Sequence, residues 1–227
     1  MSQKTLAFDV YGTLIDTRGI RIALQTMIGE RAMAFSKLWR DKQLEYSFRR
    51  GLMRNYQDFA QCTREALEYC NASFATDLGE QQKQELLRSY STLPVYDDVK
   101  AGLELLAAEG YRLFAFSNGA QASVEGLLSN AGIKDFFIDI VSVDDIKTFK
   151  PNPDVYRYFL QRADSEAKDS WLVSSNAFDV VGAISAGMNA AWLQRSPEMI
   201  FDPWDIEPTV TVYNLPSLGE ALRNFSN

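Results

Sequence analysis

Histidine is absent from this chain of 227 residues. Its absence excludes the Ser-His-Asp and Cys-His schemes of nucleophilic catalysis, and equally a histidine-ligated zinc or a histidine general base. Any catalysis by this chain therefore depends on carboxylates, lysine, arginine, serine, tyrosine or a hard metal ion.

Cysteine is scarce, and long apolar runs are missing. The two cysteines, Cys62 and Cys70, fall in a segment with helical periodicity. Eight residues at ~1.5 Å rise place them about 12 Å apart, too far for a disulfide, so we expect two free core thiols. No run reaches the length of a membrane span. The N-terminal "MSQKTLAF" enters a strand-like run without a secretory signal, so we expect a cytoplasmic protein.

Basic residues are outnumbered, with 23 Lys and Arg against 30 Asp and Glu and a net charge of −7. Nucleic acids and anionic membranes require a basic surface, so we expect neither partner. A small anionic substrate remains compatible, because a few local cations can outweigh the overall charge. The share of hydrophobic residues, 46%, is typical of a soluble globular protein, and the length allows a core domain with a smaller insertion.

Short apolar runs alternate with helical patterns over most of the chain. Strand-like runs end at Asp9, at Ser117, near residue 143 and at Ser174, and "NAAWLQR" and "TVTVYNL" are two further strand candidates. Helices are expected near residues 121–131 and 178–186. This alternation predicts an α/β fold, in which helices cover both faces of a parallel sheet.

The segment 17–92 departs from this rhythm. It contains no convincing strand, and stretches such as "AFSKLWRDKQLEYSFRR" and "QDFAQCTREALEYC" have the pattern of amphipathic helices. It begins immediately after the first strand, and Pro94 precedes the next helix of the core pattern. We therefore predict a helical cap of residues 17–92, inserted into an α/β core made of residues 1–16 and 93–227.

Polar side chains gather at the predicted strand ends. In open α/β sheets, ligands bind beyond the carboxyl ends of the strands. Each serine, asparagine or aspartate alone could be a helix cap or a turn former, but together, with a lysine added, these residues predict a functional site. The candidates are Asp9, Ser117, Asn118, Lys150, Ser174, Ser175, Asn176 and Asp179.

Asp9 ends the apolar run of "TLAFDVYGTLID", and Tyr11, not a second acid, follows two residues later. Aspartate is depleted inside strands, which favours a functional role over a turn. A carboxylate at this edge could be a metal ligand, a general base or a nucleophile, and the pattern does not distinguish between these roles.

Two cations have alternative interpretations. Lys150, in "KPNP", is either a solvated loop lysine or a group that binds an anionic substrate and keeps carboxylates ionised. Arg40 shares a helical face with Leu44 and Phe48, where it is either a snorkelling or cation–π arginine or, if that face covers the sheet edge, an anion-binding group.

Four motifs carry a family likeness. The stretches "DVYGTLID", "SNG", "KPNPDVY" and "SSNAFDVVGAISAGM" resemble, in order, the four motifs of the haloacid dehalogenase superfamily. The combination of "LWRDKQLEYS" with "SSNAFD" resembles the type II L-2-haloacid dehalogenases in particular. The likeness spans essentially the whole chain. It implies a Rossmann-like core with a four-helix-bundle-like cap, an active site between the two, Asp9 as the nucleophile and a homodimer.

The resemblance also implies site residues, position by position. Phe178 stands where family members usually have Trp, and Asp41 follows Arg40 where Gln is more usual. The implied catalytic residues are Asp9, Thr13, Arg40, Ser117, Lys150, Tyr156, Ser174, Asn176 and Asp179. The implied substrate-binding residues are Tyr11, Arg40, Leu44, Phe59, Ser117, Asn118, Lys150 and Phe178.

Phosphatases and dehalogenases of this superfamily differ in the leaving group that they expel. Its phosphatases use an acid two residues after the nucleophile to protonate a departing alkoxide, whereas a halide needs no such proton. Tyr11 at that position therefore favours dehalogenation, because loss of a general acid costs about 10²–10⁴-fold in rate. The fourth motif carries neutral Ser174, Ser175 and Asn176 ahead of a single acid, so we expect neither a metal nor another cofactor.

The expected reaction converts (S)-2-haloacids, or haloacetates, to (R)-2-hydroxy acids and halide through an ester on Asp9. The expected ligands are accordingly a small halogenated carboxylate and a halide. The sequence is compatible with two alternatives: a metal-dependent phosphatase of the same superfamily, and a non-catalytic member that binds a small molecule or a protein. The set of Asp9, Arg40, Lys150 and Asp179 argues against the non-catalytic alternative.

Overall fold

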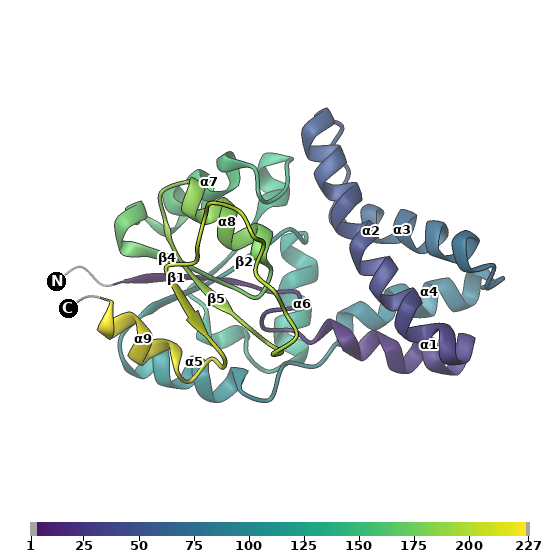
Figure 1. The fold of residues 1–227 in the computed structure, drawn as a ribbon, viewed down its shortest axis with the longest axis horizontal. Helices are drawn as coiled ribbons and strands as arrows, with labels where there is room; N and C mark the ends of the chain where they lie inside the picture. Colours follow the sequence, from purple (N-terminus) through teal and green to yellow (C-terminus); the bar gives the residue numbers. More distant parts are fainter. Residues whose placement is uncertain (1–3, 226–227) are drawn as a thin grey trace.

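The computed structural model describes residues 4–225, which contain a six-stranded parallel sheet (Figure 1). The strand order is β3-β2-β1-β4-β5-β6, so consecutive strands run outward in both directions from the centre. This order confirms the predicted α/β class, and it places the topological switch point between β1 and β4, where such sheets bind ligands. The strands are β1 Thr5–Asp9, β2 Arg112–Ser117, β3 Asp139–Ser142, β4 Ser170–Ser174, β5 Asn189–Leu193 and β6 Val210–Val212.

Helices cover both faces of the sheet, and β1 illustrates why. Its side chains alternate between two apolar clusters: Leu6 and Phe8 belong to one, and Ala7 belongs to the other. A strand buried on both faces reads as an unbroken apolar run, as "TLAF" does. One face carries α5 Val99–Ala108, α6 Gln121–Asn130 and α9 Leu218–Asn224, and the other carries α7 Pro153–Ala163 and α8 Ala177–Ser185 (Figure 1).

Four helices follow β1 before the chain returns to the sheet. They are α1 Ile20–Ile28, α2 Ala32–Met53, α3 Phe59–Phe74 and α4 Glu80–Ser89, and they stand beside the sheet in Figure 1. No strand occurs between residues 17 and 92, all of which the structure describes. The cap boundaries themselves stay a prediction. Short 3₁₀ segments lie between several of these elements: Thr17–Gly19, Gly29–Arg31, Tyr90–Thr92, Lys134–Phe136, Val143–Ile146 and Ala167–Asp169.

The helices of the cap segment pack through apolar side chains and one buried hydrogen bond. Trp39 of α2 is fully buried, and its indole Nε1 donates to the Thr63 carbonyl of α3 at 2.9 Å. Cys62 and Cys70 of α3 are buried free thiols, as predicted. Burial raises the pKa of Cys62 to about 11 and that of Cys70 to about 12, so both stay protonated at neutral pH.

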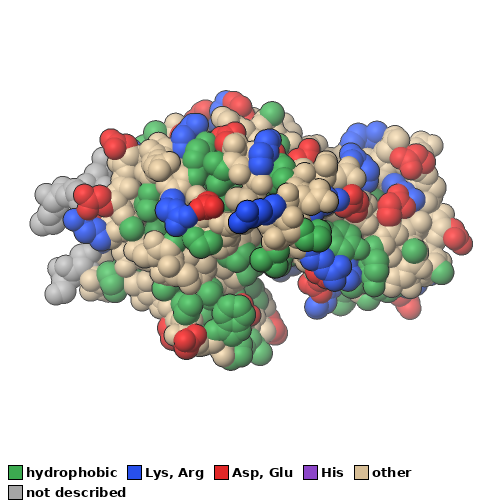
Figure 2. Space-filling view, turned by 90° about the horizontal axis from the view of Figure 1, so that it is seen from above, with side chains coloured by type: hydrophobic (Ala, Val, Ile, Leu, Met, Phe, Trp, Pro, Cys, Tyr) green, Lys and Arg blue, Asp and Glu red, His purple; other side chains and the backbone are tan. Residues whose placement is uncertain are grey.

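The surface mixes charges of both signs. In Figure 2, Lys and Arg side chains lie among Asp and Glu side chains, and the outline is indented between the sheet domain and the helical segment. Within residues 4–225, no helix is both long enough and apolar enough to cross a membrane.

Candidate active site

The carboxyl ends of three adjacent strands bring together the central residues of the site. Asp9, Ser117 and Ser174 are the last residues of β1, β2 and β4, and β1 pairs with both of the others in parallel register. All three are buried. The sequence predicted this juxtaposition, because parallel strands end at the same edge of a sheet.

The two oxygens of the Asp9 carboxylate have different surroundings. Oδ2 accepts three hydrogen bonds, from Thr13 Oγ1 at 2.7 Å, Asn176 Nδ2 at 2.7 Å and Ser174 Oγ at 3.1 Å. Oδ1 has one hydrogen-bond donor among the described residues, Lys150 Nζ at 3.3 Å. The carboxylate is thus held by one oxygen, and the other oxygen retains lone pairs for chemistry.

The groups that hold Oδ2 are themselves fixed by the backbone. Thr13 Oγ1 accepts from the Ser175 amide at 2.9 Å, and Ser174 Oγ accepts from the Asn176 amide at 3.0 Å. The loop that carries Thr13 turns at Gly12, whose φ of +86° is one that residues with a side chain rarely adopt. The "YGT" stretch therefore folds so that a threonine hydroxyl returns to the preceding strand end.

Lys150 lies at the centre of the charged groups and is 1% exposed. Its Nζ donates to Asp9 Oδ1 at 3.3 Å, to Asp179 Oδ2 at 2.7 Å and to the Phe116 carbonyl at 2.9 Å. All three ammonium protons are engaged, and two carboxylates share one positive charge. The solvated-loop interpretation of Lys150 is therefore wrong, because tertiary packing buries this loop against the ends of the strands.

Asp179 lies in the first turn of α8 and is fully buried. Burial raises its pKa to about 6; the charge of Lys150 opposes this shift and the charge of Asp9 adds to it. Tyr156 of α7 donates its hydroxyl to Asp179 Oδ1 at 2.7 Å. Burial raises the pKa of Tyr156 well above its usual range, and the Asp179 charge reinforces that shift, so the phenol remains a donor.

Ser117 and Asn118 lie beside this cluster, and among the described residues neither side chain forms a hydrogen bond with Asp9. Ser117 Oγ accepts from the Gly119 amide at 3.1 Å, and Asn118 Oδ1 accepts from the Lys150 amide at 3.0 Å. Asn118 thereby positions the Lys150 backbone. The hydroxyl proton of Ser117 and the amide group of Asn118 make no other side-chain hydrogen bond within the described part of the chain, so both can donate to a ligand.

Arg40 reaches the strand edge from the helical segment. Its Nη2 lies 3.4 Å from the Tyr11 carbonyl, which also accepts from Asn176 Nδ2 at 3.1 Å. Arg40 is half-buried and forms no ion pair with any residue between 4 and 225. The Tyr11 ring stacks on Phe59 with centroids 6.3 Å apart, and burial raises the Tyr11 pKa to about 12.

Three of the four predicted pocket residues border two different cavities. Tyr11 and Phe59 border a cavity of about 310 Å³ between the helical segment and the Gly119 loop. Phe178 packs edge-to-face on Phe48, with centroids 5.1 Å apart, and borders a separate apolar cavity of about 430 Å³. Leu44 is half-buried on α2 and borders neither of these cavities. A single pocket containing all four residues stays a prediction.

The family assignment agrees with this geometry. Residues 3–187 match the haloacid dehalogenase-like hydrolase family. The chain belongs to that family. It is 33% identical to an (S)-2-haloacid dehalogenase of Pseudomonas putida over 219 residues, which are 96% of each chain. The structure of the L-2-haloacid dehalogenase from Xanthobacter autotrophicus superimposes on this hydrolase with a TM-score of 0.92 and 31% identity, covering 98% of this chain and 99% of the other.

One supporting residue of the hydrolase escaped prediction from the sequence. Arg195 donates to the Thr13 carbonyl from Nη2 at 2.6 Å and from Nε at 3.1 Å, and its Nη1 pairs with Asp98 at 2.6 Å. It therefore anchors the loop that holds Asp9. Because Arg195 is 182 residues from Thr13 in a loop without a motif, no local pattern indicates the contact.

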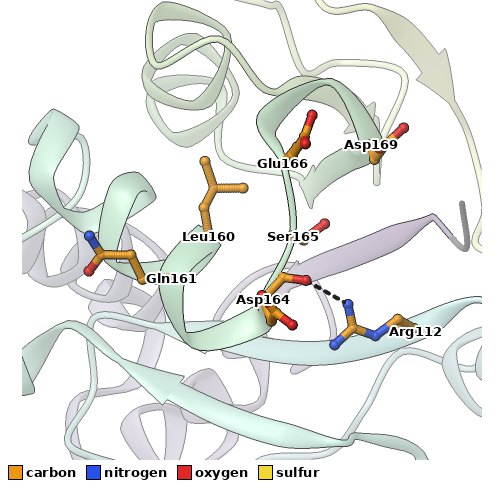
Figure 3. A pocket seen from close by; sticks show the side chains of 7 residues that line it. All are labelled: Arg112, Leu160, Gln161, Asp164, Ser165, Glu166 and Asp169. Carbon is orange, nitrogen blue, oxygen red and sulfur yellow. Dashed lines mark hydrogen bonds between the residues drawn. The ribbon is translucent and has the colours of Figure 1, made fainter.

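A larger cavity of the hydrolase, of about 620 Å³, lies away from the Asp9 cluster (Figure 3). Its wall includes Arg112, the first residue of β2, and so belongs to the amino end of the sheet. Figure 3 shows Arg112 directed toward Asp164, whose carbonyl accepts from Nη1 at 3.4 Å. The other charged residues that line this cavity, Glu166 and Asp169, are acidic, so the cavity does not suit an anionic ligand.

Proposed function

We propose that this chain converts (S)-2-haloacids, or haloacetates, to (R)-2-hydroxy acids and halide. The observation that carries the proposal is the difference between the two Asp9 carboxylate oxygens: Oδ2 accepts from three neutral donors, and Oδ1 accepts, among residues 4–225, from Lys150 Nζ at 3.3 Å alone. The names of the similar enzymes support it, as does the structure of the Xanthobacter autotrophicus enzyme with chloropropionic acid covalently bound, which is 30% identical to this chain.

In the first step, Asp9 Oδ1 attacks the carbon that bears the halogen. A carbon–oxygen bond forms, and the halide leaves with the electron pair of the carbon–halogen bond. In-line displacement inverts that carbon, which accounts for an (R) product from an (S) substrate. Thr13, Ser174 and Asn176 fix the carboxylate plane, and this orientation lowers the entropic cost of the attack.

In the second step, water cleaves the ester at the carboxylate carbon of Asp9. Asp179 takes the proton from that water, because above a pH of about 6 it is ionised and a carboxylate retains lone pairs beyond those used by Lys150 and Tyr156. The bond between Asp9 Cγ and Oδ1 then breaks, and the departing alkoxide takes the proton that Asp179 received from water. The solvent oxygen stays on Asp9, and the hydroxy acid leaves with the oxygen that Asp9 supplied.

The leaving group fits the residues around Tyr11. With a pKa of about 12, Tyr11 is a weak acid, poorly suited to protonate an alkoxide. A halide needs positive charge and not a proton. We assign Arg40 to the halide, because its guanidinium lies 3.4 Å from the Tyr11 carbonyl and no carboxylate of the described residues neutralises it.

The residues do not fit a magnesium ion. Within residues 4–225, no group of three or more His, Cys, Asp or Glu side chains is placed to hold a metal. Asp9 and Asp179, which could supply carboxylate ligands, both bind Lys150 Nζ. We therefore propose a reaction without a metal. Halide release that disappears on addition of a chelator, together with magnesium-dependent phosphate release from phosphomonoesters, would favour a phosphatase instead.

The deciding experiment measures halide release from (S)-2-chloropropionate, with the (R) isomer and fluoroacetate in parallel. Single turnover in oxygen-18 water should place the label in Asp9, detectable by peptide mass spectrometry, before it appears in product. Label that enters product directly would exclude the ester. Asp9→Asn serves as the matched control and should release no halide.

A further inference from the structure

A cationic cavity of about 320 Å³ adjoins Arg40 on the helical side of the site. Four cations border it, Arg18, Arg21, Lys37 and Arg40, with Asp41 as the one carboxylate in its wall. This concentration of positive charge opposes the net charge of the chain, −7. A depression lined by one sign of charge concentrates ions of the opposite sign.

Two of these cations are already neutralised, and two are not. Arg18 pairs with Asp16 at 2.8 Å, and Lys37 pairs with Asp41 at 2.9 Å. Arg21 donates from Nε to the Arg18 carbonyl at 3.4 Å, and within residues 4–225 neither Arg21 nor Arg40 forms an ion pair. The cavity therefore contains uncompensated positive charge.

Arg40 connects this cavity to the reacting carboxylate. Its guanidinium approaches the Tyr11 carbonyl, and that carbonyl shares Asn176 Nδ2 with Asp9 Oδ2. Tyr90 borders both this cavity and the neighbouring one of about 310 Å³, which Tyr11, Phe59 and Ala120 also line. Tyr90 thus divides a mainly apolar chamber from a cationic one.

We infer that the cationic cavity is an anion-binding vestibule through which halide leaves Arg40 for solvent. This inference rests on the proposed dehalogenase function. A halide held by an unpaired guanidinium dissociates faster when a second cation nearby stabilises it in transit. Arg21 is the residue that supplies this charge, because Arg18 and Lys37 already have carboxylate partners.

Binding of halide to the resting protein tests the vestibule without turnover. Chloride NMR line broadening, with bromide as competitor, measures the affinity for free halide. Arg21→Gln should weaken the affinity for halide about threefold, and Asp41→Asn should strengthen it about twofold. Effects of this size are expected when one charge is removed at about the Debye screening length, ~8 Å, from the bound ion. The matched control is Arg54→Gln, at an exposed arginine immediately after the C-terminal end of α2, about 21 Å from Arg40 along the helix axis. Equal affinities in Arg21→Gln and Arg54→Gln would overturn the inference.

Steady-state kinetics then distinguish an exit for halide from an entrance for substrate. Arg21→Gln should raise the inhibition constant of bromide about threefold. The KM for (S)-2-chloropropionate should change by less than about 1.5-fold. A rise in KM with an unchanged bromide constant would overturn the exit assignment. If the wild-type chain releases no halide from any haloacid, the proposed function fails, and the binding titration still reports on the cationic cavity.

Discussion

Lys150 and Arg40 approach the same site from opposite sides, and their surroundings differ completely. Lys150, at the strand edge, is 1% exposed and donates to two carboxylates and a carbonyl. Arg40, on the helical side, is half-buried and has one 3.4 Å contact with a carbonyl. The first cation is fully used by the protein itself. The second is available to bind an anionic ligand.

Because of this difference, we expect the stability of the protein to depend on Lys150 and its activity, but not its stability, to depend on Arg40. A buried cation that neutralises carboxylates cannot be removed without leaving those charges unpaired, which is strongly destabilising. A cation without a carboxylate partner can be removed at little expense in folding, so its loss should appear in activity alone. The predictions below test this separation, beginning with the largest expected effect.

Lys150→Met should abolish activity and lower the free energy of unfolding by about 3–5 kcal/mol, because Asp9 and Asp179 would then face each other unneutralised. Urea denaturation monitored by circular dichroism measures the stability, and a halide-release assay measures the activity. A stability equal to that of the wild-type protein would contradict the assignment of Lys150 as the neutralising group.

Arg40→Met should lower kcat for halide release by about 10²–10³-fold, because a preorganised cation at the leaving group is lost. Its free energy of unfolding should change by no more than about 0.5 kcal/mol. Arg54→Met, at the exposed residue that follows the last residue of α2, is the matched control and should leave both quantities unchanged. If Arg40→Met and Lys150→Met destabilise equally, the two cations do not differ as described.

Gly182→Ala should disturb the buried cluster around Lys150, because it displaces Tyr156, which donates to the Asp179 carboxylate that binds Lys150. A Cβ atom at position 182 would lie 2.3 Å from the Tyr156 hydroxyl oxygen and 2.7 Å from Pro151 Cβ. We expect a loss of about 1–3 kcal/mol and displacement of Tyr156 from Asp179. Adding Tyr156→Phe removes the closest clash, so the double variant should recover part of the stability. A double variant no more stable than Gly182→Ala would refute this account.

The change of kcat with pH should be the smallest of these effects. Asp179, with a pKa of about 6, must be ionised to accept a proton, so kcat should fall as pH drops below that value, about tenfold at one unit lower. The folded pKa lies above the model-peptide value, so the contribution of Asp179 to stability declines as pH rises from about 4 to 6. A kcat profile that is flat from pH 5 to 7 would argue against Asp179 as the base.

The sequence predicted the sheet edge well, because strand ends are local features. Apolar runs ending at Asp9, Ser117 and Ser174 indicated both the strands and their common edge, and the structure confirms both. The sequence did not predict that Oδ1 and Oδ2 of Asp9 differ, since that depends on the turn at Gly12 and on where Thr13 returns.

Contacts over long sequence separations account for what the sequence did not predict. Arg195 reaches Thr13 through tertiary packing alone, and Tyr90 divides two cavities that only the packed helices create. Phe178 borders an apolar cavity that Lys150 also lines, and it packs on Phe48, a pairing that its motif does not contain. The homodimer implied by the family resemblance stays a prediction, which light scattering of the purified protein tests.

In the proposed reaction, the three donors around Asp9 Oδ2 would acquire a second role once the ester has formed. With the substrate carbon on Oδ1, Oδ2 would become the ester carbonyl oxygen, and attack by water would turn it into the oxyanion of a tetrahedral intermediate. Thr13 and Asn176 at 2.7 Å and Ser174 at 3.1 Å already surround it, at the distances of an oxyanion hole. The groups that orient the nucleophile in one step would thus stabilise the intermediate in the next, without rearrangement.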